Sequence, residues 1–253
     1  MPIQIIPESD QASGAFNGGE ITENKPLGFP REGGTLRPYS SLFYWAHARA
    51  HVDSEIGLHP HRGFEILSFV LKGTIRHFDT KLNGWQELHA GDAQIIRAGS
   101  GIQHAEFMER DSEMFQIWFD PNLNETFAFE PSYSDYKTSV FPLTTTDGRS
   151  EKTYIGPKSP FELHTPGIDI REIGFRAGTH DLSLESDSVY SIYQMEGRSS
   201  LNGAPWQTRD FALIEGETEV RIEVEETARL FVLRSPGRVA YPTYSELMRH
   251  RLG

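Results

Sequence analysis

The 253-residue sequence contains no cysteine. Disulfides, thiolate metal sites and cysteine nucleophiles are therefore excluded, and any metal site must use His and carboxylate side chains. No apolar run approaches the roughly 20 residues that a membrane-spanning helix needs. The opening MPIQIIPESD also lacks the basic and apolar regions of a signal peptide. We therefore expect a soluble, cytoplasmic protein that does not associate with membranes.

The sequence also lacks a basic patch. Its formal net charge is −12, and basic residues such as Arg49 and Arg62 stand singly among acidic ones. Binding to a phosphate backbone draws its free energy from Lys and Arg side chains that displace counterions. Direct binding to nucleic acid is therefore not expected.

Helical periodicity is nearly absent between residues 66 and 119. Strand-like segments of about five or six residues alternate there with turn residues, a pattern typical of a sandwich or barrel. The dipeptide Asn83-Gly84 suits the positive φ angles of a tight hairpin turn. So many short strands need a closed or sandwiched sheet to protect their edges. The sequence therefore predicts an all-β fold.

A weaker second copy of this pattern lies between residues 168 and 234. Residues 195–197 match 71–73, and Leu201-Asn202-Gly203 matches Leu82-Asn83-Gly84. We therefore predict two similar β barrels in tandem, 1–140 and 141–253, joined by the Ser-, Thr- and Pro-rich stretch before residue 160. Residues 243–251 begin with an N-cap candidate and predict one short C-terminal helix.

Two pairs of metal-ligand residues have strand spacing. His59 and His61 are two residues apart, as are His104 and Glu106, so each pair can project from one face of a strand. If the two faces meet inside a barrel, three imidazoles and one carboxylate converge on one divalent ion and leave one or two coordination positions open. The plainer alternative is a hydrated polar barrel mouth.

The segment HPHRGFEILSFVLKGTIRHFD (59–79), followed by AGSGIQHAEF (98–107) and QIWFDP (116–121), resembles the N-terminal half of pirins and pirin-like bacterial quercetin dioxygenases. The resemblance covers about 60 residues. It implies two tandem cupin barrels (double-stranded β-helices, or jelly rolls). It also implies that the first barrel binds iron or a related ion through His59, His61, His104 and Glu106.

The resemblance implies two classes of function. As an enzyme, the protein would be a metal-dependent dioxygenase that takes a flavonol- or catechol-like aromatic and O2, with Glu106 accepting the substrate proton. As a non-enzymatic protein, it would be a metal- and redox-responsive module that engages a protein partner, as pirins do in transcription regulation. A cupin isomerase or sugar-binding protein is a third alternative. Fe is the first choice of ion, and Zn, Mn, Ni and Cu are alternatives because His and carboxylate ligands accept all of them.

Three further expectations concern the surroundings of the site. Counting from the matched residues places Ser183, Glu185, Ile222 and Val224 at the ligand positions of the second barrel, so we expect no metal site there. His77, Asp79 and Glu65 are candidates for hydrogen bonds that orient the ligands. Metal affinity should fall below about pH 6.5, because imidazoles must be neutral to bind.

Overall fold

The chain folds almost entirely into β strands. A computed structural model describes residues 2–28 and 35–252, and the all-β expectation is confirmed. Two α helices occur in this part of the chain, α1 (Leu123–Thr126) and α2 (Tyr244–Leu252), and 3₁₀ turns occupy Glu8–Asp10, Asn17–Gly19 and Thr138–Val140. None of the described helices is long and apolar enough to cross a membrane.

The chain forms two compact units, which we call the first and the second barrel. The first barrel consists of Gln11–Thr138, Leu163–Pro166 and Ala240–Gly253. The second barrel consists of Met1–Asp10, Ser139–Glu162 and Gly167–Val239. The main boundary between the units lies near residue 138, close to the expected division into 1–140 and 141–253. They differ from that division at both termini and at 163–166, where the chain contributes to the other unit.

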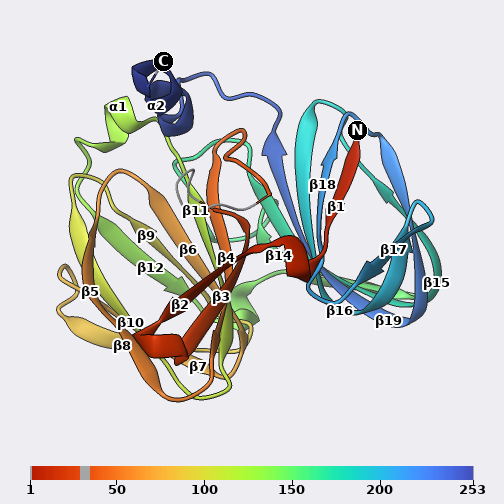
Figure 1. The fold of residues 1–253 in the computed structure, drawn as a ribbon, viewed down its shortest axis with the longest axis horizontal. Helices are drawn as coiled ribbons and strands as arrows, with labels where there is room; N and C mark the ends of the chain where they lie inside the picture. Colours follow the sequence, from red (N-terminus) through yellow and green to blue (C-terminus); the bar gives the residue numbers. More distant parts are fainter. Residues whose placement is uncertain (1, 29–34, 253) are drawn as a thin grey trace. The chain divides into compact units, whose positions relative to one another are not determined.

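The first barrel is a jelly roll of two antiparallel sheets (Figure 1). Its seven-stranded sheet has the order β12-β9-β6-β11-β4-β3-β2, and its four-stranded sheet has the order β5-β10-β7-β8. The strands are β2 (Ala12–Phe16), β3 (Ile21–Leu27), β4 (Leu42–Ala50), β5 (Ser54–His61), β6 (Glu65–Lys72), β7 (Thr74–Asp79), β8 (Gly84–His89), β9 (Ala93–Arg97), β10 (Ile102–Met108), β11 (Glu113–Phe119) and β12 (Ser132–Tyr136).

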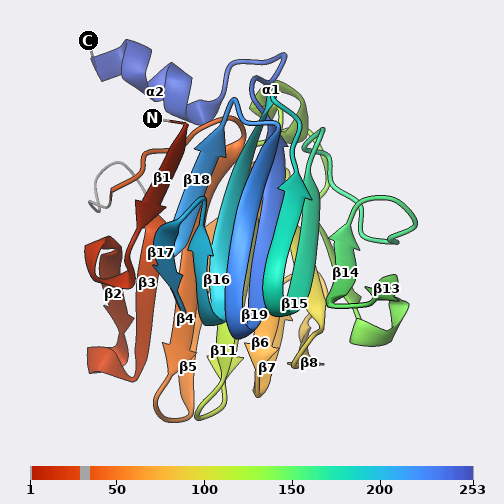
Figure 2. The ribbon, with the colours of Figure 1, turned by 90° about the vertical axis from the view of Figure 1, so that its right-hand side faces the viewer.

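The second barrel repeats this order position by position, as β1-β18-β16-β19-β15-β14-β13, with β17 paired to β16. Figure 2 shows β18, β16, β19 and β15 side by side. The strands are β1 (Ile3–Ile6), β13 (Leu143–Thr146), β14 (Arg149–Ile155), β15 (Asp169–Ser183), β16 (Ser188–Leu201), β17 (Ala204–Gln207), β18 (Phe211–Glu215) and β19 (Glu219–Pro236). The three longest strands, β15, β16 and β19, each contain a register shift. Each of them therefore runs through both layers of its barrel, where the first barrel has two separate strands. The prediction of two tandem barrels is confirmed.

Two matched glycines show that the repeat extends to backbone conformation. Gly73 and Gly197 both have positive φ, +73° and +92°. A Cβ at the first would collide with the Ser112 side chain, and one at the second with the carbonyl oxygen of Thr227. Only glycine fits such a position without strain, so the match between 71–73 and 195–197 has a structural basis.

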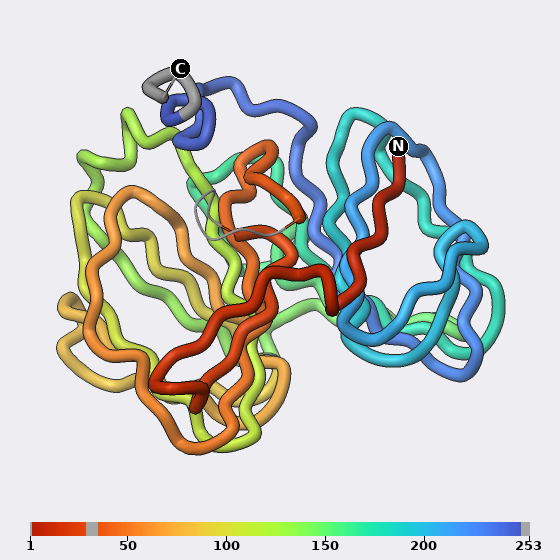
Figure 3. The backbone as a smooth tube through the Cα atoms, viewed as in Figure 1, coloured from red at the N-terminus to blue at the C-terminus, as the bar shows by residue number. Residues whose placement is uncertain are grey.

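The N-terminal strand belongs to the second barrel. β1 pairs with β18 in antiparallel register, with Ile3 opposite Ile214 and Ile6 opposite Phe211. Figure 3 shows this red segment beside the blue strands from the other end of the chain. It takes the edge position that β12 takes in the first barrel. The sequence did not predict this pairing, because nothing local marks a strand whose partner is about 200 residues away.

The two barrels have different interiors. The second is filled by a continuous apolar cluster that includes Trp206, Ile222 and Leu230. The first has smaller apolar clusters, such as the one around Ile75 and Met114. Buried polar residues fill much of its remaining interior, and these are Ser68, His77, Asp79, Gln94, His104 and Glu106. The interior of the first barrel is therefore partly polar, whereas that of the second is mainly apolar.

The predicted C-terminal helix is confirmed as α2, and a capping box begins it. The Oγ1 of Thr243 accepts from the backbone N–H of Glu246 at 3.4 Å, and the Glu246 carboxylate accepts from the backbone N–H of Thr243 at 2.8 Å. The carboxylate of Asp120 also accepts from the backbone N–H of Tyr244. Asp120 lies just after β11, so this bond ties the helix to the seven-stranded sheet.

Asp120 is expected to make stability depend on pH. Burial raises its pKa from 3.8 to about 7, against the opposing effect of its bond to Tyr244. Between these two values the folded state holds a proton that the unfolded state has released, so stability falls as pH rises from about 4 to 7. The loss should reach a few kcal/mol. Asp120→Asn should remove this dependence, which thermal unfolding at pH 5 and pH 8 would measure. Equal pH dependence in the two proteins would contradict the assignment.

Candidate metal centre

The four predicted ligand residues lie on two neighbouring strands of the first barrel. His59 and His61 are on β5, and His104 and Glu106 are on β10. The strands are antiparallel partners, with His59 directly opposite His104. β5 is the edge strand of its sheet, which explains how it accommodates Pro60 between the two histidines.

The structure brings the three imidazoles together. One nitrogen from each of His59, His61 and His104 lies within 4.8 Å of the other two. The ring centroids are 4.8 Å apart for His59 and His61, 4.3 Å for His59 and His104, and 4.7 Å for His61 and His104. The geometric condition for a shared ion is therefore met by these three side chains.

Unpartnered ring nitrogens show that the cluster fits a metal ion. Both nitrogens of His104 and Nε2 of His61 are buried and have no hydrogen-bond partner among the described residues. Leaving a buried polar atom unpaired costs about 1–3 kcal/mol. His59 differs, because its Nδ1 lies 2.8 Å from the carbonyl oxygen of Gly57. If Nδ1 carries the proton and donates there, Nε2 is free to coordinate.

Burial keeps two of these imidazoles neutral. It lowers the pKa of His61 to about 4, with the neighbouring His59 adding to the effect. Burial also lowers the pKa of His104 well below 6.5, and the surrounding histidines lower it further. Protons therefore compete for these two ligands only at lower pH than the unperturbed histidine value of about 6.5 suggests. The fall in metal affinity that the sequence places near pH 6.5 should shift downward accordingly.

Glu106 is buried behind the cluster, and other side chains hold its carboxylate. Gln116 Nε2 donates to Oε2 at 2.7 Å, and the Ser68 hydroxyl donates to Oε1 at 3.3 Å. Burial raises the pKa of this carboxyl group, while the nearby His59 and the two hydrogen bonds lower it. Among the described residues, the group of ligand atoms within 4.8 Å contains the three histidines and not Glu106. Its role as the fourth ligand stays a prediction.

A buried polar network extends from Glu106 into the seven-stranded sheet. Ser68 accepts a hydrogen bond from Gln94 at 3.1 Å, and Gln94 in turn accepts one from the Tyr133 hydroxyl at 3.0 Å. Trp118 donates to Gln116 at 3.1 Å. The sequence did not predict a role for these residues. The signal was a single polar residue inside each of three apolar strands, since a polar group there needs a buried partner.

The residues expected to orient the ligands have other partners. His77 Nε2 bonds to Asp79 at 2.9 Å, and the His77 ring stacks on Tyr133 at 4.3 Å. Asp79 also accepts from the backbone N–H groups of residues 81 and 82. Glu65 accepts from the backbone N–H groups of His164 and Thr165. Within the described chain these bonds do not reach a ligand imidazole, although the His77 ring centroid lies 5.7 Å from that of His104. The role of the three residues in orienting the ligands stays a prediction.

The cluster is reached from solvent through an opening of about 560 Å³. It is lined by Pro60, His61, Arg62, Thr80, Gly101, Ile102 and Gln103. The Trp118 ring packs edge-on against His61, with ring centroids 4.7 Å apart. One imidazole of the cluster therefore forms part of the wall of an opening that lies within the size range of ligand pockets.

The second barrel has no comparable cluster among its described residues. Ile222 and Val224 belong to its apolar core. Ser183 is opposite Glu219 in the strand pairing, and Ile222 is opposite His180. The Nε2 of His180 lies 2.9 Å from the carbonyl oxygen of Arg176 in the same strand. The absence of a metal site in this barrel stays a prediction.

Comparison with known proteins agrees with the family resemblance seen in the sequence. The sequence model of the family described as Pirin matches residues 34–119. A quercetin 2,3-dioxygenase of Escherichia coli K12 is 42% identical over 184 residues, which are 71% of this chain and 76% of that protein. A pirin-like protein of Caulobacter vibrioides is 30% identical over 200 residues, 75% of this chain and 83% of that one.

Solved structures share the fold. A bacterial pirin from Escherichia coli in complex with nickel(II) superposes with a TM-score of 0.77 at 21% identity, covering 94% of this chain and 100% of that one. This structural match shows the fold, and the relatives at 30% and 42% identity show the family. The predicted pair of cupin barrels is confirmed, and the chain belongs to the pirin family.

Proposed function

We propose that this protein is a metal-dependent dioxygenase of small aromatic compounds of the flavonol or catechol type. The observation that carries the proposal is the cluster of three imidazoles with unpartnered buried nitrogens beside a solvent-connected opening. The quercetin 2,3-dioxygenase name of the Escherichia coli relative supports this substrate class.

His59, His61 and His104 would hold one divalent ion, with Glu106 as the proposed fourth ligand. Three nitrogens and one carboxylate suit Fe, and they also accept Zn, Mn, Ni or Cu. When bound, such an ion would supply a Lewis acid for a substrate hydroxyl, and Fe, Mn, Ni or Cu would also supply a redox centre for O2. The Pro60 and Ile102 side of the opening offers apolar surface to a flat ring, and Gln103 and Thr80 offer polar groups.

Glu106 is proposed to accept the proton of the substrate hydroxyl at one of its carboxylate oxygens. It is the only carboxylate among the four residues, and Gln116 and Ser68 fix its orientation. Both partners donate to the charged form. They therefore position the carboxylate while leaving each oxygen a second lone pair for a proton.

Replacing Glu106 by Gln should slow turnover more than it weakens metal binding. The amide keeps the shape of the side chain but cannot accept the substrate proton, and loss of a general base typically costs about 10²–10⁴ in rate. Turnover per bound metal and metal dissociation constants measured on the same preparations would separate the two effects. Equal losses in both would reject the role as proton acceptor.

One experiment distinguishes the dioxygenase function from that of a metal-responsive binding protein. The purified protein would be loaded anaerobically with Fe(II) and then exposed to air with quercetin and related flavonols. We expect O2 uptake that depends on substrate and disappears after chelation. No uptake with any flavonol would reject the dioxygenase and favour a module that engages a protein partner. Metal analysis of freshly purified protein would identify the ion.

A further inference from the structure

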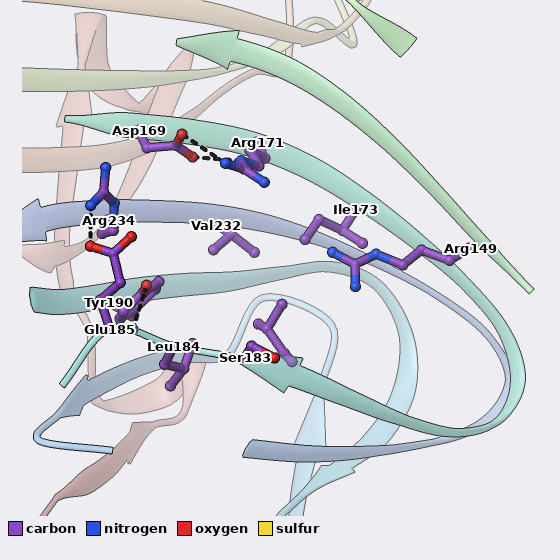
Figure 4. A pocket seen from close by; sticks show the side chains of 11 residues that line it. Arg149, Asp169, Arg171, Ile173, Ser183, Leu184, Glu185, Tyr190, Val232 and Arg234 are labelled. Atoms are coloured by element: carbon purple, nitrogen blue, oxygen red, sulfur yellow. Dashed lines mark hydrogen bonds and ion pairs between the residues drawn. The ribbon is translucent and has the colours of Figure 1, made fainter. Parts of the chain in front are cut away.

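The second barrel contains a cavity of about 300 Å³ that lies outside the metal centre (Figure 4). Its apolar lining comes from β15, β19 and the segment after β15, namely Ile173, Leu182, Leu184 and Val232. Its volume reaches the lower end of the range for pockets that hold small organic ligands. Ser183 and Glu185, the counterparts of the first histidine pair by counting along the repeat, also line it.

The charged groups in and beside the lining balance one another. Arg149, Arg171 and Arg234 line the cavity with Asp169 and Glu185, and Glu151 beside the lining pairs with Arg149 and Arg171. The whole chain has a formal net charge of −12. Three guanidinium groups in one cavity of so acidic a chain make it a more favourable place for an anionic ligand than the rest of the acidic surface.

Both carboxylates in this lining hold a guanidinium group, as the dashed lines in Figure 4 show. Asp169 accepts two hydrogen bonds from Arg171, at 2.6 and 2.9 Å. Glu185 accepts one from Arg234 Nη1 at its Oε2 atom, at 2.5 Å. A ligand that presents acceptors to the remaining N–H groups of these arginines would leave the pairs intact.

Donors, by contrast, remain available. Arg234 uses Nη1 on Glu185, and Arg149 uses Nη2 on Glu151 at 2.6 Å. Their other N–H groups have no acceptor within the described chain. The Tyr190 hydroxyl accepts from the backbone N–H of Glu185 at 3.0 Å, which leaves its own hydrogen free to donate. Burial raises the pKa of Tyr190, so the phenol stays protonated at neutral pH.

From these observations we propose that the second barrel binds a small organic monoanion, an aromatic or aliphatic carboxylate. Its carboxylate accepts from the guanidinium of Arg234 and the hydroxyl of Tyr190. Its apolar body lies against Val232, Ile173 and Leu184. Arg171 is held by Asp169 and Glu151, so it lines the cavity without binding the ligand, whereas Arg234 is the cation that determines specificity. This site goes beyond the proposed oxygenase function, because it uses no metal ligand.

Ligand-observed NMR with sodium benzoate, on protein freed of metal by chelation, tests the proposal. Chelation removes binding of the carboxylate to a metal ion as an explanation. We expect benzoate to bind with a dissociation constant of about 1 mM or tighter, and neutral benzamide to bind at least about tenfold more weakly. Because only the chelated protein is used, failure here is separate from failure of the oxygenase assay.

Three variants make the test specific. Arg234→Gln should weaken benzoate binding at least about tenfold, and Tyr190→Phe by about three- to tenfold. Arg221→Gln is the matched control, because Arg221 is on the same strand β19 and pairs with Asp181 but does not line the cavity. It should leave benzoate binding unchanged. Circular dichroism would verify that each variant is folded. If Arg234→Gln does not fold, benzoate binding to Tyr190→Phe tests the proposal instead.

Three results would overturn the proposal. The first is no binding of benzoate, phenylacetate or octanoate at concentrations up to about 10 mM, about tenfold above the expected dissociation constant. The second is an equal loss of affinity, or no loss, in Tyr190→Phe and Arg221→Gln. The third is equal affinity for benzoate and benzamide, which would show that the negative charge of the ligand does not matter for binding.

Discussion

His104→Leu is expected to abolish metal binding and at the same time to stabilise the metal-free protein. Loss of one of three clustered nitrogens should lower metal affinity by more than the roughly 10–100-fold that follows loss of a supporting group around a metal. In the metal-free protein both nitrogens of His104 are buried without a partner, at a cost of about 1–3 kcal/mol each. Leucine removes that cost and has a similar volume.

Thermal unfolding with and without added metal measures both effects. The parent protein should gain stability from the metal, because an ion that binds only the folded state stabilises it by mass action. His104→Leu should show no gain, and its metal-free melting temperature should lie a few degrees above that of the parent, as about 1 kcal/mol shifts a domain of this size by roughly 2–4 °C. His89→Ala is the control, because His89 is exposed and its ring pairs with Glu87 and Thr74 rather than with the cluster. A lower metal-free melting temperature would contradict the cost assigned to the unpaired nitrogens.

Glu65→Ala is expected to destabilise the first barrel by about 3–5 kcal/mol. The Glu65 carboxylate is buried and accepts from the backbone N–H of His164 at 2.7 Å and from the N–H and hydroxyl of Thr165 at 2.9 and 2.6 Å. Arg97 lies 3.9 Å from the same group. Alanine would leave several buried donors without this acceptor and a guanidinium without a charged neighbour.

A graded series separates charge from shape. Glu65→Gln keeps one acceptor oxygen, so its loss in free energy of unfolding should be smaller than that of Glu65→Ala. Glu87→Ala removes an exposed carboxylate from β8 and should change stability by less than about 0.5 kcal/mol. Denaturant unfolding monitored by tryptophan fluorescence would measure all three variants. A loss below about 1 kcal/mol in Glu65→Ala would show that water replaces the carboxylate without difficulty.

The strands that could be predicted from sequence have local signals. The apolar segment at 66–71 becomes β6, and the hairpin at Asn83-Gly84 joins β7 to β8, with Asn83 at a φ of +52°. Alternation and turn chemistry depend only on neighbours along the chain, so they are visible without a structure. The spacing of His59 and His61 belongs to the same class of signal, and both residues lie on one strand as expected.

What could not be predicted depends on residues far apart in the sequence. The anchoring of His164 and Thr165 by Glu65 joins residues about 100 positions apart. The partners of Glu106 come from β6 and β11, so the spacing of His104 and Glu106 predicted a shared face but not the bonds that hold the carboxylate. The cavity in the second barrel has no local signal either, since Tyr190 and Arg234 meet only through the pairing of β16 with β19.

The placement of β1 has a consequence for how the protein is made. Ile3–Ile6 is synthesised before the other described strands, yet its partner β18 ends only at Glu215. This segment therefore stays unpaired while residues 11–138 of the first barrel are translated. Expressing those residues together with residues 1–10 would leave β1 without its partner strand, and expressing the chain from residue 139 would expose the unpaired edge of β18 to neighbouring molecules. Separate production of the two barrels therefore requires that residues 1–10 be attached to the second, and it also has to keep residues 163–166 and 240–253 with the first.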